Sequence, residues 1–178
     1  MDLLRICFTH DGDSIKAMCR ARRRLVDKKA VALEYAVTSI VLIAGSLIVG
    51  SSRGLGLLLI LLSCWAFVAL GNVADRQAKQ IVEGLKGVFP SLRYSFYEDR
   101  VTVEFPTATD EIPYPDIGGL YEDSQFFYLL LRSSAVYIIK KQAVPDKAAL
   151  CSALAESAGL KWKKLRNSLQ LSDIFRRQ

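Results

Sequence analysis

The acidic side chains of the C-terminal half are the first candidates for chemistry. Asp116, Glu122 and Asp123 lie within a short stretch, and the single histidine of the chain is His10. Acid–base catalysis or metal binding by these acids needs a partner base or a further ligand. His10 falls in a predicted surface turn far away in the sequence. We therefore interpret the acids as residues that form turns and end strands.

Other patterns that carry chemistry are missing from the sequence. Asp11-Gly12-Asp13 lacks the remaining oxygen ligands of a calcium loop, and there is no nucleophile elbow, glycine-rich phosphate loop or zinc-ligand spacing. The cysteines form no CxxC pair, so we expect reduced thiols at all four positions: Cys7, Cys19, Cys64 and Cys151. The sequence predicts a protein without enzymatic activity, cofactor or metal.

A block of positive charge, "RARRRLVDKK" (20–29), lies near the N-terminus of a chain whose formal net charge is +6. Such a block binds phosphate, either of nucleic acid or of the anionic face of a membrane. Two apolar runs follow it directly, at 30–50 and 54–73, with only "SSR" between them. The position of the block therefore favours lipid over nucleic acid.

The two apolar runs are each about 20 residues long, the length at which an α-helix crosses the hydrocarbon of a bilayer. Only Glu34 is charged in either run, whereas a soluble helical hairpin would carry charges along one face. We predict two antiparallel transmembrane helices, with Glu34 near the interface, where it reaches water or a neighbouring arginine. Trp65 is predicted to pack between helices. Two small-residue pairs would allow close contact within the hairpin or between copies: Ala32 with Ala36 and Ser46 with Gly50.

The orientation of the hairpin follows from its flanking charges. Basic residues precede the first span and follow the second, whereas the turn carries Arg53 alone. By the positive-inside rule, both termini are predicted to be cytoplasmic. The basic block then lies at the inner leaflet, and we expect its side chains to contact lipid headgroups: Arg20, Arg22, Arg23, Arg24, Lys28 and Lys29.

The chain after the spans begins with helical periodicity over 75–88, which predicts an extension of the second span that stops near Phe89-Pro90. The periodicity then changes to two, which predicts antiparallel strands. These strands are expected at 92–96, at 101–105, as a short piece around Ile112, and at 117–123.

The stretch "FFYLLLRSSAVYIIKK" (126–141) is apolar enough to suggest a third span, but its polar turn breaks it into two short runs. We interpret it as a β-hairpin buried on both faces. An amphipathic helix follows, starting at Pro145-Asp146 and stopping at Gly159.

The predicted fold class is an α+β membrane protein, with a two-helix transmembrane hairpin and an antiparallel β domain. About five strands closed by the C-terminal amphipathic helix resemble, at fold level, the half-open barrel of pleckstrin-homology (PH) domains. Leu4, Ile6 and Phe8 alternate with polar residues, so a strand before the hairpin is expected to pair with the sheet after it. The expected division is an N-terminal strand, a basic helix with both spans and their extension, a β domain and a basic tail: 1–12, 13–90, 91–160 and 161–178.

The start of the tail, "KWKKLRNS" (161–168), alternates basic and bulky apolar residues. It is interpreted either as a solvated extension of the preceding helix or as an element on the membrane surface. In the second case lipid contacts would come from Lys161, Trp162, Lys163, Lys164 and Arg166.

Two segments carry a family resemblance, "YSFYEDRVTV" (94–103) and "IPYPDIGGLYEDSQFFYLLLRSSAVYIIKKQAV" (112–144). They resemble the C-terminal domain of YcxB-like proteins, which are small bacterial membrane proteins with two adjacent spans and a cytoplasmic β-rich domain. The resemblance implies that architecture and a bacterial cell membrane, and it implies no activity.

The expected function is that of a membrane-anchored cytoplasmic interaction or regulatory module. The expected partners are membrane lipid, a protein and a second copy of the chain, and nucleic acid is not among them. One alternative is a sensor of anionic lipid headgroups at the inner leaflet. A small transporter subunit or an enzyme is the alternative that the sequence favours least.

Overall fold

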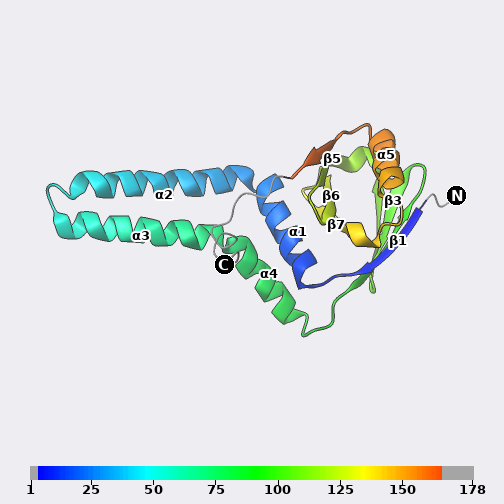
Figure 1. Ribbon diagram of the computed structural model, residues 1–178, viewed down its shortest axis with the longest axis horizontal. Helices are drawn as coiled ribbons and strands as arrows, with labels where there is room; N and C mark the ends of the chain where they lie inside the picture. The colour runs from blue at the N-terminus through cyan, green and yellow to red at the C-terminus, as the bar shows by residue number, and fades with distance from the viewer. Residues whose placement is uncertain (1–3, 166–178) are drawn as a thin grey trace.

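The computed structural model describes residues 4–165 of the chain. A long helical hairpin projects from a β-rich body, and two shorter helices lie where the two parts meet (Figure 1). The fold is α+β, with helices α1 to α5 and two four-stranded sheets.

The hairpin consists of α2 (Lys28–Ile48) and α3 (Arg53–Gly71). With 21 and 19 residues, the helices are about 31 Å and about 29 Å long, close to the thickness of the bilayer hydrocarbon. Only 6% and 11% of their most apolar windows are buried inside the protein, which is unlike the core helices of a soluble domain. Both helices are therefore long and apolar enough to cross a membrane, and their apolar side chains are exposed to the surroundings.

Two buried glycines set the close contact between α2 and α3. A Cβ atom on Gly45 would lie 2.9 Å from Cβ of Leu59, and one on Gly56 would lie 2.6 Å from the backbone nitrogen of Val49. The small-residue pairs named from the sequence do not make this contact, because all their members are exposed: Ala32, Ala36, Ser46 and Gly50. Their use in contacts between copies stays a prediction. Trp65 is also 68% exposed, so it faces away from the partner helix instead of packing against it.

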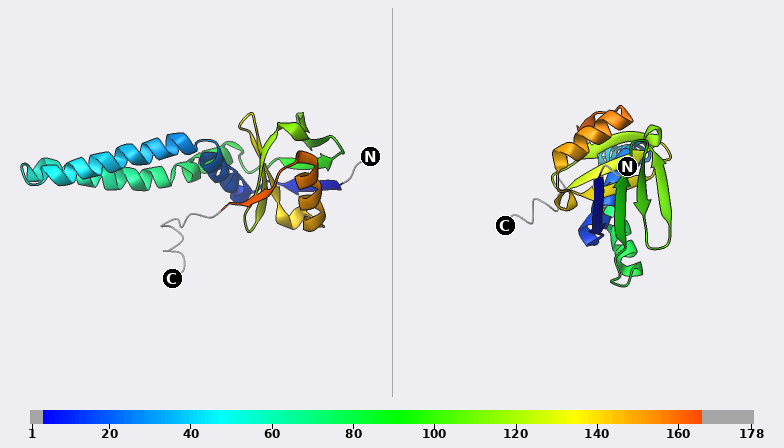
Figure 2. Two further views of the ribbon diagram at one scale, coloured as in Figure 1. Left: turned by 90° about the horizontal axis from the view of Figure 1, so that it is seen from above. Right: turned by 90° about the vertical axis from the view of Figure 1, so that its right-hand side faces the viewer.

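The base of the hairpin turns directly into α1 (Gly12–Leu25) on one side and α4 (Val73–Gly84) on the other. Short joints separate these helices from α2 and α3, namely Val26-Asp27 before α2 and Asn72 after α3. Figures 1 and 2 show that α1 runs across the long axis of the hairpin. Helix α4 ends at Gly84, earlier than the proline predicted, because Lys86 and Gly87 adopt φ angles of 48° and 81°.

The first sheet has the order β1-β2-β3-β4 and is antiparallel throughout. Its strands are β1 (Leu4–Thr9), β2 (Ser91–Phe96), β3 (Arg100–Glu104) and β4 (Thr109–Pro113). Strand β1 precedes the hairpin and pairs with β2, which follows it, from Leu4 opposite Phe96 to Thr9 opposite Ser91. This is the pairing that we expected from the alternation at the N-terminus.

The second sheet has the order β7-β6-β5-β8. Its strands are β5 (Ile117–Glu122), β6 (Phe126–Leu131), β7 (Val136–Lys140) and β8 (Trp162–Lys164). The hairpin predicted in the most apolar stretch is β6 and β7, and β8 pairs with β5 in parallel. The described chain thus has eight strands. Five are those expected to form the half-barrel, β1 is the predicted N-terminal strand, β4 is the short piece predicted around Ile112, and β8 was not predicted.

One core fills the space between the sheets, with Tyr94, Phe127 and Tyr128 among its largest buried side chains. The hydroxyl of Tyr94, on β2, donates to the carbonyl of Ile138, on β7, at 2.9 Å, which links the two sheets. Helix α5 (Lys147–Ala158) adds Leu150 and Leu154 to this core.

The ends of α5 follow from its capping residues. The side chain of Asp146 accepts a hydrogen bond from the backbone of Ala149, and Gly159 ends the helix with a φ of 62°. Pro145 therefore lies just outside the helix instead of at its first position. Two 3-10 turns complete the described chain, η1 (Tyr114–Asp116) and η2 (Lys141–Ala143).

Candidate binding site at the base of the hairpin

Helices α1 and α4 pack against each other through small apolar side chains at the base of the hairpin. Ile15 and Cys19 of α1 form a buried cluster with Ala74 and Ala78 of α4. The adjoining face of α1 buries Ala21 completely in the main core of the β domain. Helix α1 is therefore shared between the helix pair and the β domain.

An acidic residue of α4 holds α1 in place. Asp75 accepts two hydrogen bonds from the guanidinium of Arg20, at 2.8 and 2.9 Å, and lies 3.4 Å from Nζ of Lys16. Partial burial alone would raise the pKa of Asp75, but the hydrogen bonds and charges of Arg20 and Lys16 outweigh it and lower the pKa below its ordinary value of 3.8. The stability that this ion pair contributes is thus complete above pH 3.8 and is lost only as the pH falls through the lowered pKa.

A second ion pair joins α1 to both long helices. The guanidinium of Arg23 donates to Glu34 of α2 at 2.6 Å and to the carbonyl of Leu70, near the end of α3, at 3.4 Å. The prediction that Glu34 reaches a neighbouring arginine is therefore confirmed. Arg23 is well shielded, with 17% of its side chain exposed, so the contact fastens the base of the hairpin.

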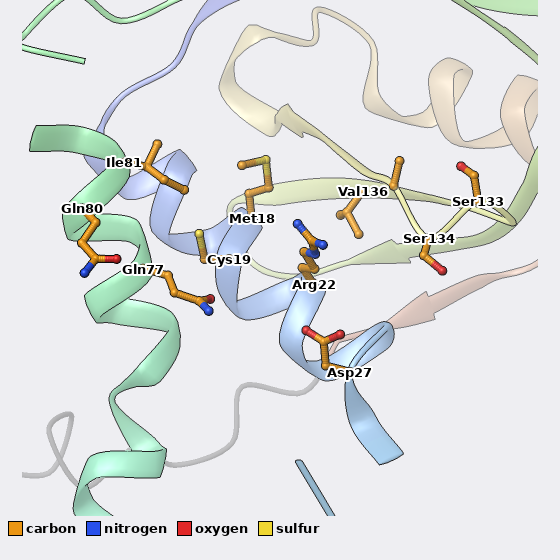
Figure 3. A pocket seen from close by; sticks show the side chains of 11 residues that line it. Met18, Cys19, Arg22, Asp27, Gln77, Gln80, Ile81, Ser133, Ser134 and Val136 are labelled. Carbon is orange, nitrogen blue, oxygen red and sulfur yellow. The ribbon is translucent and has the colours of Figure 1, made fainter. Parts of the chain in front are cut away.

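A cavity of about 840 Å³ opens beside these ion pairs, between α1, α4 and the turn that joins β6 to β7 (Figure 3). Apolar side chains line it from α1, from α4 and from the start of β7, namely Met18, Ile81 and Val136. The polar side chains of the lining are Arg22, Asp27, Gln77, Gln80, Ser133 and Ser134. Figure 3 shows Gln77 pointing across the gap towards α1.

The structure separates the basic residues that the sequence assigned to lipid contact. Arg20 and Arg23 are held in ion pairs inside the protein. The sequence indicated an arginine partner for Glu34, but it did not indicate the pairing of Arg20 with Asp75. Arg22 lines the cavity, and Arg24 is half-buried. The lysines that begin α2 are exposed at the base of the hairpin: Lys28 and Lys29.

The second predicted lipid-contact set lies on β8 and next to it. Lys161, Lys163 and Lys164 are exposed, and β8 runs back towards the joint between α1 and α2 (Figures 1 and 2). The two exposed sets of lysines therefore lie at the same end of the β domain. Arg166 lies outside the described residues.

Trp162 does not fit either interpretation of the tail. Its indole nitrogen donates to the carbonyl of Cys151 at 2.9 Å, and its ring packs 5.1 Å from that of Phe127. The side chain is therefore used inside the domain and is not a contact for headgroups. The segment is also a strand instead of a helix. It pairs with the edge of β5 that β6 leaves free, from Leu120 opposite Trp162 to Glu122 opposite Lys164.

Two of the three clustered acids have structural partners. Asp123 accepts hydrogen bonds from the backbone of Phe126 at 2.7 Å and from the hydroxyl of Tyr128 at 2.6 Å, and Glu122 pairs with Lys141 at 2.7 Å. Asp116 is exposed in η1. Within residues 4–165, no group of three or more histidine, cysteine, aspartate or glutamate side chains could hold a metal ion.

His10 is buried, which corrects the surface turn predicted for it. Its Nδ1 lies 2.9 Å from Oγ of Ser14, and its ring meets that of Phe8 edge-on at 5.1 Å. Asp11 beside it begins α1, accepting from the backbone of Ser14 at 2.7 Å, and pairs with Lys140 of β7 at 2.7 Å. These residues connect β1, α1 and β7.

Sequence reasoning missed the α4 and turn residues of the cavity lining. Gln77 and Gln80 are exposed polar positions of an amphipathic helix, and Ser133 and Ser134 belong to a short turn. No spacing in the sequence relates them to Arg22, since the three elements meet only in the folded protein.

Comparisons with known proteins give little further information. No protein-family model matches the chain, and no curated protein matches it. Among solved structures, the chain is similar to one described as "Structure of the Spt16D Pob3N heterodimer", at 16% sequence identity and a TM-score of 0.38. The match covers 46% of this chain and spans half the length of the other, 50%. At this TM-score the similarity supports no conclusion about the fold or function of this chain.

Proposed function

We propose that the protein is a membrane-anchored cytoplasmic interaction module with a regulatory role and without catalytic chemistry. The observation that carries this proposal is the double use of α1, which packs against α4 at the base of the hairpin and also buries Ala21 in the core of the β domain. A partner bound to the β domain therefore acts on the helices that continue into the hairpin. In the same way, a change in the position of the hairpin helices would act on the β domain through α1.

The remaining parts of the proposal concern the setting of the module. The apolar surface of α2 and α3 supports insertion in a membrane, since so large an exposed patch is unstable in water. The basic residues around the base support a cytoplasmic β domain with both termini on that side, in a bacterial cell membrane. Membership of the YcxB-like family and a PH-like half-barrel closed by α5 belong to the same proposal. The half-barrel would have to accommodate eight strands instead of the five or so expected from the sequence.

Site-specific photo-crosslinking in intact cells tests the proposed interaction. A photoreactive residue would replace Glu111, exposed on the edge strand β4, or Gln125, exposed in the turn between β5 and β6. The matched control replaces Arg53, the first residue of α3 next to the hairpin turn, which the proposal puts on the other side of the membrane. We expect a discrete protein adduct from a β-domain position and none of the same mass from Arg53. Adducts from Arg53 alone, or from no position, contradict the proposal.

A second candidate function is sensing of anionic lipid headgroups. The observation that favours it is the placement of exposed lysines at the hairpin end of the β domain, three around β8 and two at the start of α2: Lys161, Lys163, Lys164, Lys28 and Lys29. Attraction of about 1 kcal/mol for each lysine near an anionic surface would draw the domain onto the bilayer.

Hydrogen exchange of the full chain in lipid nanodiscs tests the second candidate. Exchange around β8 should be slower in anionic than in neutral nanodiscs, and salt should remove the difference because the Debye length is about 10 Å at 0.1 M. Reversing the charge at Lys161, Lys163 and Lys164 should abolish the difference. Lys147→Glu, on the remote helix α5, should leave it unchanged. Equal exchange in both lipids contradicts lipid sensing.

A further inference from the structure

We infer that the cavity between α1, α4 and the β6–β7 turn holds the headgroup of one phospholipid that carries both a phosphate and an ammonium group. Arg22 would take the phosphate and Asp27 the ammonium, as in a phosphoethanolamine headgroup. This inference rests on the membrane placement proposed above. It assigns the cavity a ligand of its own, separate from the exposed lysines.

The first argument is the contrast between paired and unpaired polar groups at the base of the hairpin. Arg20, Arg23 and Lys16 are all satisfied by carboxylates of neighbouring helices. Within the described residues, by contrast, no side-chain hydrogen bond or ion pair is made by the six polar residues of the lining: Arg22, Asp27, Gln77, Gln80, Ser133 and Ser134. All six are exposed on the rim and walls of one cavity, so they are available to a ligand without breaking a contact within the protein.

The second argument is the charge of the lining. It contains one guanidinium, one carboxylate, two amides and two hydroxyls, so its formal charge is balanced. A purely anionic headgroup would leave the carboxylate of Asp27 without a counter-charge, and a purely cationic ligand would do the same to Arg22. A headgroup with one charge of each sign satisfies both. The Gln and Ser side chains supply further donors for phosphate and ester oxygens.

The third argument is depth. Arg22 precedes the first residue of α2 by six positions, and Gln77 follows the last residue of α3 by six positions. At 1.5 Å per helical residue, six positions correspond to about 9 Å, so both residues lie close to the ends of the apolar helices. The headgroup layer on one side of a bilayer is about 5 to 8 Å thick. Helix α1 runs across the hairpin axis and so stays near the ends of α2 and α3 (Figure 1).

The fourth argument concerns size and the apolar part of the lining. About 840 Å³ falls within the range of about 300 to 1,000 Å³ that is typical of small-molecule sites, which is ample for a headgroup with its glycerol. Met18, Ile81 and Val136 then contact the glycerol and the first methylene groups of the chains. Asp27 lies on the hairpin side of the cavity, next to the start of α2, where a lipid enters from the leaflet (Figure 3).

The experiment counts the lipids that the full chain retains. The chain would be inserted in nanodiscs of phosphatidylethanolamine and phosphatidylglycerol in equal amounts, extracted in mild detergent and examined by native mass spectrometry. We expect one phosphatidylethanolamine to be retained in preference to phosphatidylglycerol. Arg22→Gln should lower the retained fraction of either lipid by about tenfold, as expected for a lost charge-assisted hydrogen bond.

The variant at the other charge gives a distinct signature. Asp27→Asn keeps the phosphate contact but removes the partner of the ammonium, so it should abolish the preference for phosphatidylethanolamine while one lipid is still retained. Matched controls lie on the exposed side of α4, Arg76→Gln and Glu83→Gln, and should behave as the unmodified chain does. Neither control residue lines the cavity.

Three results would overturn the inference, and they differ from a failure of the proposed anchoring. One is a retained fraction of lipid that is the same in Arg22→Gln and in its control, Arg76→Gln. Another is a preference for phosphatidylethanolamine that Asp27→Asn does not change. A third is Arg22-dependent binding of soluble phosphoethanolamine, followed by phosphorus NMR, with no lipid retained. A chain that does not elute with nanodiscs at all contradicts the membrane anchoring itself, before any lipid is counted.

Discussion

Individual residues at the base of the hairpin decide how firmly α1 is held. Asp75 receives two charge-assisted hydrogen bonds from Arg20 and a weaker contact from Lys16, with its side chain 25% exposed. The pair Lys79–Glu83 on the same helix differs in every respect, since it lies at 3.7 Å with both side chains largely exposed. Only the first of these ion pairs should matter for stability.

Asp75→Ala should therefore loosen α1 from α4 by about 1 to 2 kcal/mol, the range between an exposed pair and a partly shielded bidentate one. Amide hydrogen exchange in α1 and α4 measures this opening free energy directly. Glu83→Ala serves as the control and should change it by less than about 0.5 kcal/mol. Similar effects of the two substitutions would show that the Asp75 contact does not hold the helices.

Burial of His10 makes the joint between β1 and α1 sensitive to pH. Desolvation lowers the pKa of His10 below its ordinary value of 6.5, and the charge of Asp11 opposes this only in part. The unfolded chain then binds a proton more readily than the folded one, so stability should fall as the pH drops through 6.5. Burial would raise the pKa of Asp11, but its hydrogen bonds to Lys140 and Ser14 lower it below 3.8, so Asp11 stays charged in this range.

We expect the Tm of the full chain in detergent to fall between about pH 7.5 and about pH 5.5. His10→Gln keeps a polar group beside Ser14 but does not titrate, so its Tm should change less over the same range. Thermal unfolding followed by circular dichroism at several pH values makes the comparison. A wild-type Tm that does not depend on pH in this range would show that His10 does not become protonated on unfolding.

At the scale of elements, the contact between α2 and α3 depends on glycine. Gly45 and Gly56 allow the two helices to approach so closely that an added Cβ would overlap the partner helix. In lipid, where apolar side chains gain little by contacting each other, such close packing is a main source of helix association. The exposed leucines of the hairpin contribute far less to it.

Gly56→Ala should weaken the hairpin by about 1 to 3 kcal/mol, because the new methyl group lies 2.6 Å from the Val49 backbone and forces the helices apart. Gly54→Ala, two residues earlier on the same helix, meets nothing within 4 Å and should be neutral or slightly stabilising. Unfolding in mixed micelles with increasing SDS measures both. Equal midpoints for the two variants would contradict the close contact.

The whole molecule depends on the pairing of chain segments from before and after the hairpin. Cys7 of β1 lies opposite Arg93 of β2, and both side chains are exposed. Arg93→Cys should therefore form a disulfide with Cys7 on mild oxidation of membranes. Glu104→Cys, one strand further away, should not. The background for both replaces the other three cysteines with alanine: Cys19, Cys64 and Cys151.

A faster migration of the oxidised Arg93→Cys chain on a non-reducing gel would report the closed loop. A chain that stays in its reduced form would mean that β1 and β2 do not meet in the membrane-bound protein, and would argue against both termini lying on one side. The test therefore bears on the topology of the whole chain as well as on one strand pair.

Much of this architecture could be predicted from periodicity, because each span and each hairpin strand carries its own pattern. The hairpin of β6 and β7 is one example, since its polar turn interrupts the apolar run that a third span would need. Strand β8 could not be found in this way. Three residues carry no period, and their place is set by the packing of Trp162 on Phe127.

The candidate site was harder to predict than the fold. Arg20 and Asp75 are 55 positions apart, so the sequence showed a basic block and did not show which of its members are neutralised. The cavity likewise needs α1, α4 and the β6–β7 turn to meet, and each contributes residues that are unremarkable on a solvated surface. Pairings between distant segments are a property of the packed chain, and local patterns do not contain them.

The pairing of β1 with β2 also has a consequence for biogenesis. Roughly 80 residues separate the two strands, and a ribosome adding about 5 to 20 residues per second needs several seconds to cover that distance. During this time β1 has been synthesised but has no partner. If α2 and α3 enter the membrane as proposed, the first sheet can be completed only when insertion has returned the chain to its original side. Protection of β1 from proteolysis would therefore mark, in a growing or newly made chain, the moment at which insertion has succeeded.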